Sequence, residues 1–424
     1  MKLVFPITIL FLTAAACAPR LRTERFVLPP AIAMPQTEPP PGQRAPVRPA
    51  ATSCADWEGC LPDPEHPEYL PMRYLRINFH VMDKTDSTAH RPADSVRVFL
   101  RELVKRSNED LAVNERNWRS PEGTRVLPKG YRYALTPQPV PGDEGIYFHY
   151  DDDLYYFVSS GKYQNNYDRK VIQKYAFGAD TILNIFLQVH PRDSFGSKTY
   201  RPNGQGIALG TALKMAGVLE SSEGPESFDG LLNHEVGHIL GIGHAWVEDG
   251  CPDTENHPNK CWTGSKDPPC RDQATNNMMD YNAYQLALTP CQIGRAQATL
   301  ANEKSAVRRC LIPTWCTLRE DRAVVIADSV AWTGARDLEG HISVAPGGVL
   351  HLSCRVSLPP GARITVQPGG QLCLDGCRLH NACGKTWEGI FVQEQNGVRG
   401  EVRILRQPLL ENIADNPKRN RNKR

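Results

Sequence analysis

Three histidines and one glutamate lie within eleven consecutive positions of the chain, in the segment LLNHEVGHILGIGHAW at residues 231–246. On a helix, His234 and His238 are one turn apart and project from the same face, so two imidazoles can reach one ion. Glu235 is adjacent in sequence to the first of them. This combination predicts a metal site beside a carboxylate that can accept a proton.

A third ligand this close in sequence requires the chain to turn after the helix. Gly241 permits the positive φ that ends a helix abruptly, and the turn would bring His244 back toward the first two histidines. Three neutral imidazoles with an open fourth position are typical of a catalytic zinc site, because structural sites normally have four protein ligands. A helix with incidental histidines is the alternative, but it explains neither the glycine nor the third histidine.

The elements that must position these residues can also be read from the sequence. Ser227 or Asp229 is expected to cap the histidine-bearing helix. Its apolar packing residues would be Leu231, Leu232, Val236, Ile239 and Leu240. Upstream we expect an amphipathic helix over residues 93–112, capped by Asp94 or Ser95, and strands at residues 74–82, 131–137, 145–150 and 182–189, the first of them half-buried. This mixture of helices and strands indicates an α+β or α/β domain.

A second kind of structure is expected after Cys316. The segment ISVAPGGVLHL at residue 342 recurs as ITVQPGGQLCL at residue 364, an offset of 22 residues. This period matches one coil of a β-solenoid, and TWEGIFV at residue 386 could begin a third coil. A small β-sandwich with two similar hairpins is the alternative.

The first residues, MKLVFPITILFLTAAACAP, predict an export signal rather than a membrane-spanning helix. The AAAC ending resembles the lipobox of bacterial lipoproteins, in which Cys17 would carry the acyl chains. We therefore expect an exported protein, lipid-anchored to the bacterial outer membrane in the periplasm or at the cell surface, with simple secretion as the alternative. From Pro29 to Pro49 there are eight prolines, a composition typical of an extended tether.

Charge and cysteine content add two expectations. The chain has 49 basic and 47 acidic residues, and this balance gives no reason to expect a nucleic-acid partner. Apart from Cys17, twelve cysteines remain, and in an exported chain they predict disulfides. They fall into even-numbered clusters, so local pairing is possible throughout. For Cys54 and Cys60 we expect a small disulfide loop.

The segment HEVGHILGIGH matches the full signature of the metzincin metallopeptidases, which the chain resembles. The downstream segment NNMMDYNAYQ places Met279 35 residues after His244, where metzincins have a methionine in a tight turn. The pattern NxMDY, the cysteine-bearing insert before it and LTPCQIGRAQ after it resemble the pappalysin family, including bacterial members. This specific similarity covers about residues 228–297.

The resemblance implies a role for each matching residue. His234, His238 and His244 would bind one catalytic Zn²⁺, and Glu235 would be the general base. Met279 would form the floor of the site. Tyr281 would stand near the metal, where its phenol could stabilise an oxyanion, and a packed turn tyrosine is the alternative.

The resemblance also suggests two further features. Some family members bind Ca²⁺ through acidic loops near the site, and Asp249, Asp253 and Glu255 are the candidates here. The acidic segment YDDDLYY at residue 150 is more typical of a solvated turn than of a Ca²⁺ site. Some metzincin pro-segments block the zinc with a cysteine thiolate, which is the alternative for Cys54 and Cys60.

These observations predict a signal peptide at residues 1–17, a proline-rich linker or pro-segment at 18–69 and a zinc metallopeptidase domain at 70–312. An all-β, solenoid-like domain at 313–410 and a basic disordered tail at 411–424 would follow. The catalytic domain would be metzincin-like α+β, with a twisted mixed sheet and an active-site helix. Its expected activity is zinc-dependent endopeptidase cleavage of a protein or peptide substrate, and no oligomeric state is predicted. The alternatives are a surface-anchored protein whose β domain binds a glycan or protein while its metal domain is inactive, and a zinc amidase acting on cell-wall peptides.

Overall fold

The computed structural model describes residues 21–29, 54, 56–88, 92–136, 143–190, 204–257, 274–282 and 284–415. The predicted signal peptide with Cys17, most of the proline-rich stretch, Cys261, Cys270 and residues 416–424 lie outside this part. Within it, none of the helices combines the length and the apolar character needed to cross a bilayer.

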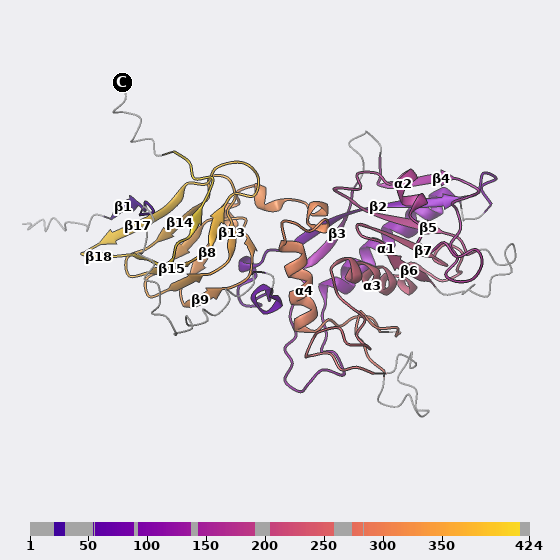
Figure 1. Cartoon of the computed structure of the whole chain (residues 1–424), viewed down its shortest axis with the longest axis horizontal. Coiled ribbons are helices and arrows are strands. Elements are labelled where there is room, and N and C mark those ends of the chain that lie inside the picture. Colours follow the sequence, from indigo (N-terminus) through magenta and orange to yellow (C-terminus); the bar gives the residue numbers. More distant parts are fainter. Residues whose placement is uncertain are drawn as a thin grey trace, which may run out of the picture.

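The first half of the chain is built on a six-stranded sheet, called here the first sheet, with strand order β3-β2-β5-β7-β6 and β4 paired to β2 (Figure 1). Its strands are β2 (Arg73–Asp83), β3 (Tyr131–Leu135), β4 (Ile146–Tyr150), β5 (Leu183–Gln188), β6 (Gln205–Ala208) and β7 (Ala212–Ala216). All pairs are parallel except β6 with β7. The four strands expected from sequence are confirmed. The half-buried character expected for β2 is confirmed in its first residues, where Tyr74 is exposed and Arg76 partly exposed, but it is wrong from Asn78 to Asp83, where every residue is buried.

Helices cover both faces of the first sheet. Alternate β2 residues Leu75, Ile77, Phe79 and Val81 belong to a core shared with α1 (Ala93–Ala112) and α3 (Asp229–Ile239). On the opposite face, Met82 and Phe186 pack against the short α2 (Lys170–Tyr175). A fourth helix, α4 (Pro290–Ala301), has a capping box formed by Thr289 and Gln292.

The predicted helix caps are wrong, although α1 has the predicted bounds. α1 follows Pro92 without a side-chain cap, and the Ser95 hydroxyl donates backward to the Pro92 carbonyl at 2.7 Å. α3 follows a 3-10 helix at Pro225–Ser227, so Ser227 cannot be its N-cap residue. Asp229 instead accepts a hydrogen bond from the neighbouring Gly230 N–H at 2.7 Å.

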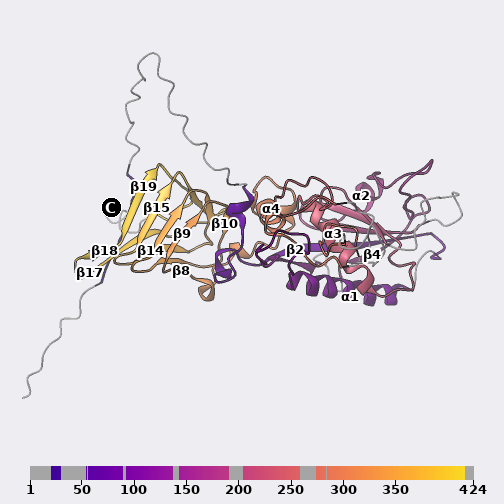
Figure 2. The same ribbon diagram turned by 90° about the horizontal axis from the view of Figure 1, so that it is seen from below.

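The last hundred residues form three further sheets, which together with β1 are called here the β part (Figure 1). One has the order β1-β17-β14-β11-β8 with β18 on β17, and the others are β10-β13-β16-β20 and β19-β15-β12-β9. The strands are β8 (Val324–Ile326), β9 (Ser329–Trp332), β10 (Arg336–Asp337), β11 (Ile342–Val344), β12 (Val349–Leu352), β13 (Arg355–Ser357), β14 (Arg363–Val366), β15 (Gln371–Asp375), β16 (Arg378–His380), β17 (Gly389–Gln395), β18 (Val398–Arg399), β19 (Glu401–Arg406) and β20 (Leu409–Leu410). The view in Figure 2 places these strands at one end of the molecule and α2 and β4 at the other, with α4 between them.

The two copies of the sequence repeat lie side by side in this part. Ile342 pairs with Ile364 and Leu350 with Leu372, both in parallel register. Ile390, in the segment expected to begin a third coil, pairs in parallel with Ile364. Strands joined in hairpins would pair antiparallel, whereas the repeated strands pair parallel. Each residue of the first copy lies beside the residue 22 positions later in the sequence.

Ordered structure begins before residue 70, contrary to expectation. β1 (Arg22–Arg25) pairs antiparallel with β17, and the Phe26 N–H donates to the Ile390 carbonyl at 2.8 Å. 3-10 helices occupy Trp57–Cys60 and Pro67–Tyr69. A linker is therefore the wrong description of these segments, because β1 pairs with the edge of β17 and Phe26 packs against the apolar core of the β part. A pro-segment, the other expectation for residues 18–69, stays a prediction.

The disordered tail was expected to begin at residue 411, but residues 411–415 still belong to the folded structure. The Trp387 N–H donates to the Asn412 carbonyl at 2.9 Å, and the Ala414 N–H donates to the Trp387 carbonyl at 2.8 Å. Residues 411–415 thus continue the backbone pairing of the β part. The Arg25 guanidinium donates to the Ala414 carbonyl at 2.5 Å, so both ends of the described chain meet there.

Of the three disulfides in the described part of the chain, two join different clusters of cysteines, whereas the bond between Cys251 and Cys291 lies within one cluster, as local pairing allowed. Cys54 pairs with Cys354 across 300 residues, Cys316 with Cys383, and Cys251 with Cys291. The expected Cys54–Cys60 loop is wrong, because Cys54 meets its partner through tertiary packing. Cys60 is a buried thiol whose pKa is raised by burial, which also argues against a zinc-blocking thiolate.

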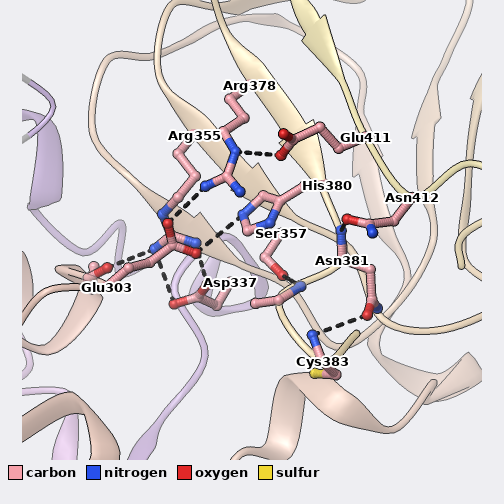
Figure 3. A network of polar contacts seen from close by, with 12 residues as sticks. Glu303, Asp337, Arg355, Ser357, Arg378, His380, Asn381, Cys383, Glu411 and Asn412 are labelled. Atoms are coloured by element: carbon pink, nitrogen blue, oxygen red, sulfur yellow. Dashed lines mark hydrogen bonds and ion pairs between the residues drawn. The ribbon is translucent and has the colours of Figure 1, made fainter. Parts of the chain in front are cut away.

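A buried ionic cluster joins β2 and the segment after α4 to the β part. Figure 3 shows one of its contacts, between Asp337 and Arg355. Asp337 accepts hydrogen bonds from Arg308 at 2.6 and 2.9 Å and from Arg355 at 2.5 Å. The Arg73 guanidinium donates to the Asp337 carbonyl at 3.0 Å. Although burial alone would raise the pKa of Asp337, the Arg355 and Arg308 charges hold that pKa well below its usual range. The carboxylate is therefore ionised and links three arginines from separate segments.

Candidate metal centre

The helix α3, which bears His234, Glu235 and His238, packs into the core beside the first sheet. Leu232 and Val236 are fully buried in the core beneath the first sheet, and Leu231 and Ile239 pack partly against it, as expected. His234 and Glu235 are buried as well, with 2% and 5% of their surface exposed. The helix therefore holds both side chains in fixed positions.

Two backbone carbonyls set the tautomers of the first two histidines. His234 Nδ1 lies 2.9 Å from the Met278 carbonyl oxygen, and His238 Nδ1 lies 2.9 Å from that of Ile242. A carbonyl oxygen can only accept, so both Nδ1 atoms carry the proton. Each Nε2 atom is then left with a free lone pair, as metal coordination requires.

His244 completes the group after the helix ends. Gly241 has φ 82°, and the Ile242 N–H donates back to the Gly237 carbonyl at 3.0 Å. This turn brings His244 Nε2 to 3.0 Å from His238 Nε2, which is itself 3.2 Å from His234 Nε2.

The spacing of these nitrogens fits one zinc ion. A tetrahedral zinc with Zn–N bonds of about 2.0–2.1 Å separates its ligand nitrogens by roughly 3.3 Å. The separations of His238 Nε2 from the other two Nε2 atoms, 3.2 and 3.0 Å, lie close to that value, and the ligand atoms of all three histidines lie within 4.8 Å of one another. Without a cation their lone pairs would face one another unfavourably. The donor set therefore fits Zn²⁺, with His234, His238 and His244 as its ligands.

Burial keeps the three imidazoles neutral. It lowers the pKa of His234 to about 3 and that of His244 to about 4, and it also lowers the pKa of His238. A neutral imidazole is the form that binds a metal ion. The site is therefore prepared for a cation at neutral pH.

Glu235 lies between α3 and the edge strand β6. Burial raises the pKa of Glu235 to about 7, and a hydrogen bond from the Ala208 backbone acts in the opposite direction. A Cβ at Gly206 would lie 2.5 Å from Glu235 Cγ, so only glycine allows the strand to approach this closely. The carboxyl group is thus held beside an open strand edge with a pKa suited to proton transfer at neutral pH.

Met279 lies directly beneath α3, where the floor of the site was expected. It is fully buried, and a Cβ at Gly237 would overlap its Sδ atom. The Met279 carbonyl accepts from the Ala245 N–H at 2.9 Å. The methionine therefore contacts both the helix and the loop that carries His244.

Tyr281 stands at the rim of the site. Its ring centroid is 5.6 Å from that of His234 and 5.3 Å from that of His244, and 47% of its surface is exposed. Burial of the remainder raises the pKa of Tyr281, so the phenol stays protonated. It can donate a hydrogen bond toward a group bound at the metal.

Sequence reasoning missed three contributors to the site: Gly206, Gly237 and Trp246. Trp246 stacks on His244 with ring centroids 3.9 Å apart and an interplanar angle of 17°. The two-residue spacing between His244 and Trp246 does not by itself predict this contact, because the contact depends on how the loop folds. Gly206 lies in a short strand, QGIA, that has no recognisable pattern.

The candidate calcium ligands are engaged in protein contacts. Asp249 accepts from the Cys251 N–H at 2.8 Å and from the Thr254 hydroxyl at 2.7 Å. Asp253 accepts from the Cys291 N–H at 2.9 Å, and Glu255 pairs with Arg119 at 3.0 Å. Cys251 and Cys291 lie beside Asp253 but form a disulfide, so their sulfurs are not thiolate ligands.

The acidic segment at residue 150 is also held by protein contacts. Asp151 accepts from Lys174 at 2.7 Å and from the Tyr175 hydroxyl at 2.8 Å, and Asp152 accepts from the Thr85 hydroxyl at 2.7 Å. These contacts agree with the turn expected there rather than with a cation site.

Neither a known protein family nor a curated protein matches the sequence. Among solved structures, the chain is similar at low identity to mirolysin of Tannerella forsythia. Mature mirolysin in complex with a cleaved peptide aligns at 18% identity and TM-score 0.37, covering 56% of this chain and 95% of that chain. Mirolysin in complex with compound 9 aligns at 17% identity and TM-score 0.38, covering 57% and 96%.

Proposed function

We propose that this chain is a zinc-dependent endopeptidase that hydrolyses peptide bonds in a protein or peptide substrate. The observation that carries the proposal is the convergence of three neutral histidine Nε2 atoms, 3.0 and 3.2 Å apart, beside the buried carboxyl group of Glu235. Three imidazoles leave a zinc ion with an open position, as in catalytic sites.

Zinc bound by His234, His238 and His244 would supply Lewis-acid chemistry, acidifying a water molecule and polarising the scissile carbonyl. The carboxylate of Glu235 accepts the proton of that water and then delivers it to the leaving amine. The Tyr281 hydroxyl donates to the carbonyl oxygen as negative charge develops on it. None of these steps needs a covalent bond between the substrate and the protein.

The position of β6 supports an extended peptide as substrate. In the described part of the first sheet β6 pairs only with β7, so its other edge is open on the side where Glu235 lies. A peptide segment can add to such an edge through main-chain hydrogen bonds. It would then cross the site with a peptide bond close to Glu235.

The β part is a β-solenoid in this proposal. Its support is the parallel pairing of residues 22 positions apart in two sheets, as in Ile342 with Ile364 and Leu350 with Leu372, and of residues 23 positions apart in the third, as in Val356 with Leu379. Successive coils stack their apolar residues into one core that includes Trp332 and Trp387. The proposed division is a catalytic domain over residues 70–312 and the solenoid over 313–410, with β1 added to the solenoid.

Export and lipid anchoring at Cys17 belong to the same proposal and rest on the AAAC sequence. The five-residue step from Cys17 to Arg22 spans at most about 17 Å when fully extended. Because β1 pairs with β17, an anchor at Cys17 would hold the β part close to the membrane. The proline-rich stretch lies between β1 and Cys54, which both attach to the β part, so it would not serve as the tether.

The proposal is tested by incubating the purified chain with unfolded casein and with cell-wall peptides. We expect cleavage of casein that a zinc chelator abolishes and added Zn²⁺ restores. Hydrolysis of cell-wall peptides alone would instead identify an amidase. Binding of a glycan or protein without any hydrolysis would identify a binding protein.

A further inference from the structure

The three histidines of the metal centre are held in different ways. His234 and His238 each donate from Nδ1 to a backbone carbonyl at 2.9 Å. Within the part of the chain that the structure describes, His244 has no corresponding carbonyl partner. Its ring is instead packed face to face on the indole of Trp246, with centroids 3.9 Å apart and an angle of 17°.

Other rings close the remaining sides of His244. The His238 ring meets it edge to face at 4.5 Å and 82°, and the Tyr281 ring meets it at 5.3 Å and 68°. Trp246 also contacts Tyr281 directly, with centroids 4.4 Å apart. The indole therefore touches both the third ligand and the tyrosine at the rim, as the His234 ring also does, with its centroid 5.3 Å from that of His244 and 5.6 Å from that of Tyr281.

The backbone around Trp246 is fixed independently of its side chain. The Ala245 N–H donates to the Met279 carbonyl at 2.9 Å, and the His257 N–H donates to the Trp246 carbonyl at 3.2 Å. These bonds place the Cα atoms of His244 and Trp246 but leave the torsions of the His244 ring unset. Among the rings that pack on His244 the indole is the nearest, with its centroid at 3.9 Å, so stacking on it restricts the ring to an orientation in which Nε2 faces the other two histidines.

We propose that Trp246 is a positioning residue for the metal centre, orienting His244 and Tyr281 through its ring face. This inference rests on the proposed function, because it assumes that His244 binds zinc. In this proposal the indole face of Trp246 orients His244, whereas backbone carbonyl oxygens orient His234 and His238. Losing an outer partner of a metal ligand typically weakens metal affinity about 10- to 100-fold.

The test uses the full mature chain with Trp246→Ala, Trp246→Leu and Trp246→Phe. Zn²⁺ affinity is measured by competition with a chromophoric chelator, and the visible spectrum of the Co²⁺-substituted protein reports the ligand geometry. We expect Trp246→Ala and Trp246→Leu to lose affinity by about 10-fold or more and to change the Co²⁺ spectrum. Trp246→Phe, which keeps a ring face, should stay within about threefold of the original chain.

Trp118→Ala is the matched control, because Trp118 is a half-exposed tryptophan that contacts Tyr284 and none of the histidines. It should leave zinc affinity and the Co²⁺ spectrum unchanged. Unfolding of each variant in excess chelator separates a loss of fold from a loss of affinity. If Trp246→Ala does not fold, the proposal is tested by comparing the Zn²⁺ affinity of Trp246→Leu with that of Trp246→Phe.

Equal affinity for the leucine and phenylalanine variants would overturn the proposal, because packing volume alone would then suffice. Affinity of Trp246→Ala within about threefold of the original chain would overturn it too, since outer partners normally matter more than that. Failure of the original chain to bind zinc would instead refute the proposed function. The two failures are thus distinguishable.

Discussion

The Sδ atom of Met279 packs so closely against Gly237 that a single methyl group added at position 237 would overlap it. Gly237 lies one residue before the ligand His238, and Met279 also holds the His244 loop through its carbonyl oxygen. The contact therefore couples the helix carrying two ligands to the loop carrying the third.

Gly237→Ala should destabilise the chain and weaken zinc binding, because the methionine or the helix must shift to admit the methyl group. Overpacking of this kind costs about 1–3 kcal/mol. Thermal unfolding and chelator competition measure the two effects. Gly243→Ala is the control, since a Cβ there would make an ordinary contact with Asp249 at 3.4 Å. Unchanged stability and affinity in Gly237→Ala would show that the contact is not constraining.

Glu235→Gln should retain zinc and lose most turnover. The amide preserves the shape of the side chain but cannot accept the proton of the attacking water, and general base catalysis typically contributes about 10²- to 10⁴-fold. The measurement is kcat/KM on a fluorogenic peptide together with the zinc content. Glu65→Gln, a change at an exposed glutamate outside the site, should behave like the original chain. Full activity in Glu235→Gln would remove the general base from the mechanism.

Asp337→Asn should destabilise the packing of the β part against β2 and the segment after α4, which contribute Arg73 and Arg308. Removing the charge leaves Arg308, Arg355 and Arg73 buried without their anion, and breaking a buried ion pair costs about 3–5 kcal/mol. The pKa of Asp337 in the folded protein is depressed below its unfolded value of about 3.8. Its stabilising contribution is therefore complete above that pH and is lost as the pH falls below it toward the folded pKa.

Denaturant unfolding between pH 7 and pH 3 tests this prediction. The difference in stability between the original chain and Asp337→Asn should be largest at neutral pH and should shrink below about pH 4. Asp321→Asn, at an exposed aspartate that pairs with Arg319, should change little. A difference that is small or independent of pH would show that the charge of Asp337 does not stabilise the junction.

Peptide mapping without reduction should recover a Cys54–Cys354 linked peptide. That bond attaches the segment before the first sheet to the β part, so Cys354→Ser should also lower thermal stability, by about 2–5 kcal/mol. Reduction should lower the stability of the original chain in the same direction. A linked Cys54–Cys60 peptide would instead restore the small loop that the sequence suggested.

The parts of the structure that the sequence predicted are those with local patterns. Alternating apolar residues identified β2, the spacing of Val96, Phe99 and Leu103 identified α1, and the 22-residue offset matched the pairing of Ile342 with Ile364. The spacing of His234, His238 and His244 anticipated that their rings would meet, since the turn at Gly241 is local.

The parts that could not be predicted depend on contacts between distant segments. The polar sequence RTER of β1 becomes a strand because β17 offers it a free edge. Cys54 finds Cys354 through the packing of the β part, which no spacing in the sequence encodes. Ser227 failed as a cap because a 3-10 helix leads directly into α3. Trp246 was overlooked because stacking on His244 is visible only once the loop is folded.

The most direct test of the account is the transition-metal content of the purified chain at neutral pH, measured by elemental mass spectrometry after removal of loosely bound ions. The account predicts one zinc per chain, reduced in His238→Ala. Zinc should be released only as the pH falls well below 6, because burial lowers the pKa of His234 to about 3 and that of His244 to about 4, and protons compete with the metal for an imidazole only near its pKa or below. A chain that holds no stoichiometric transition metal at neutral pH would contradict it.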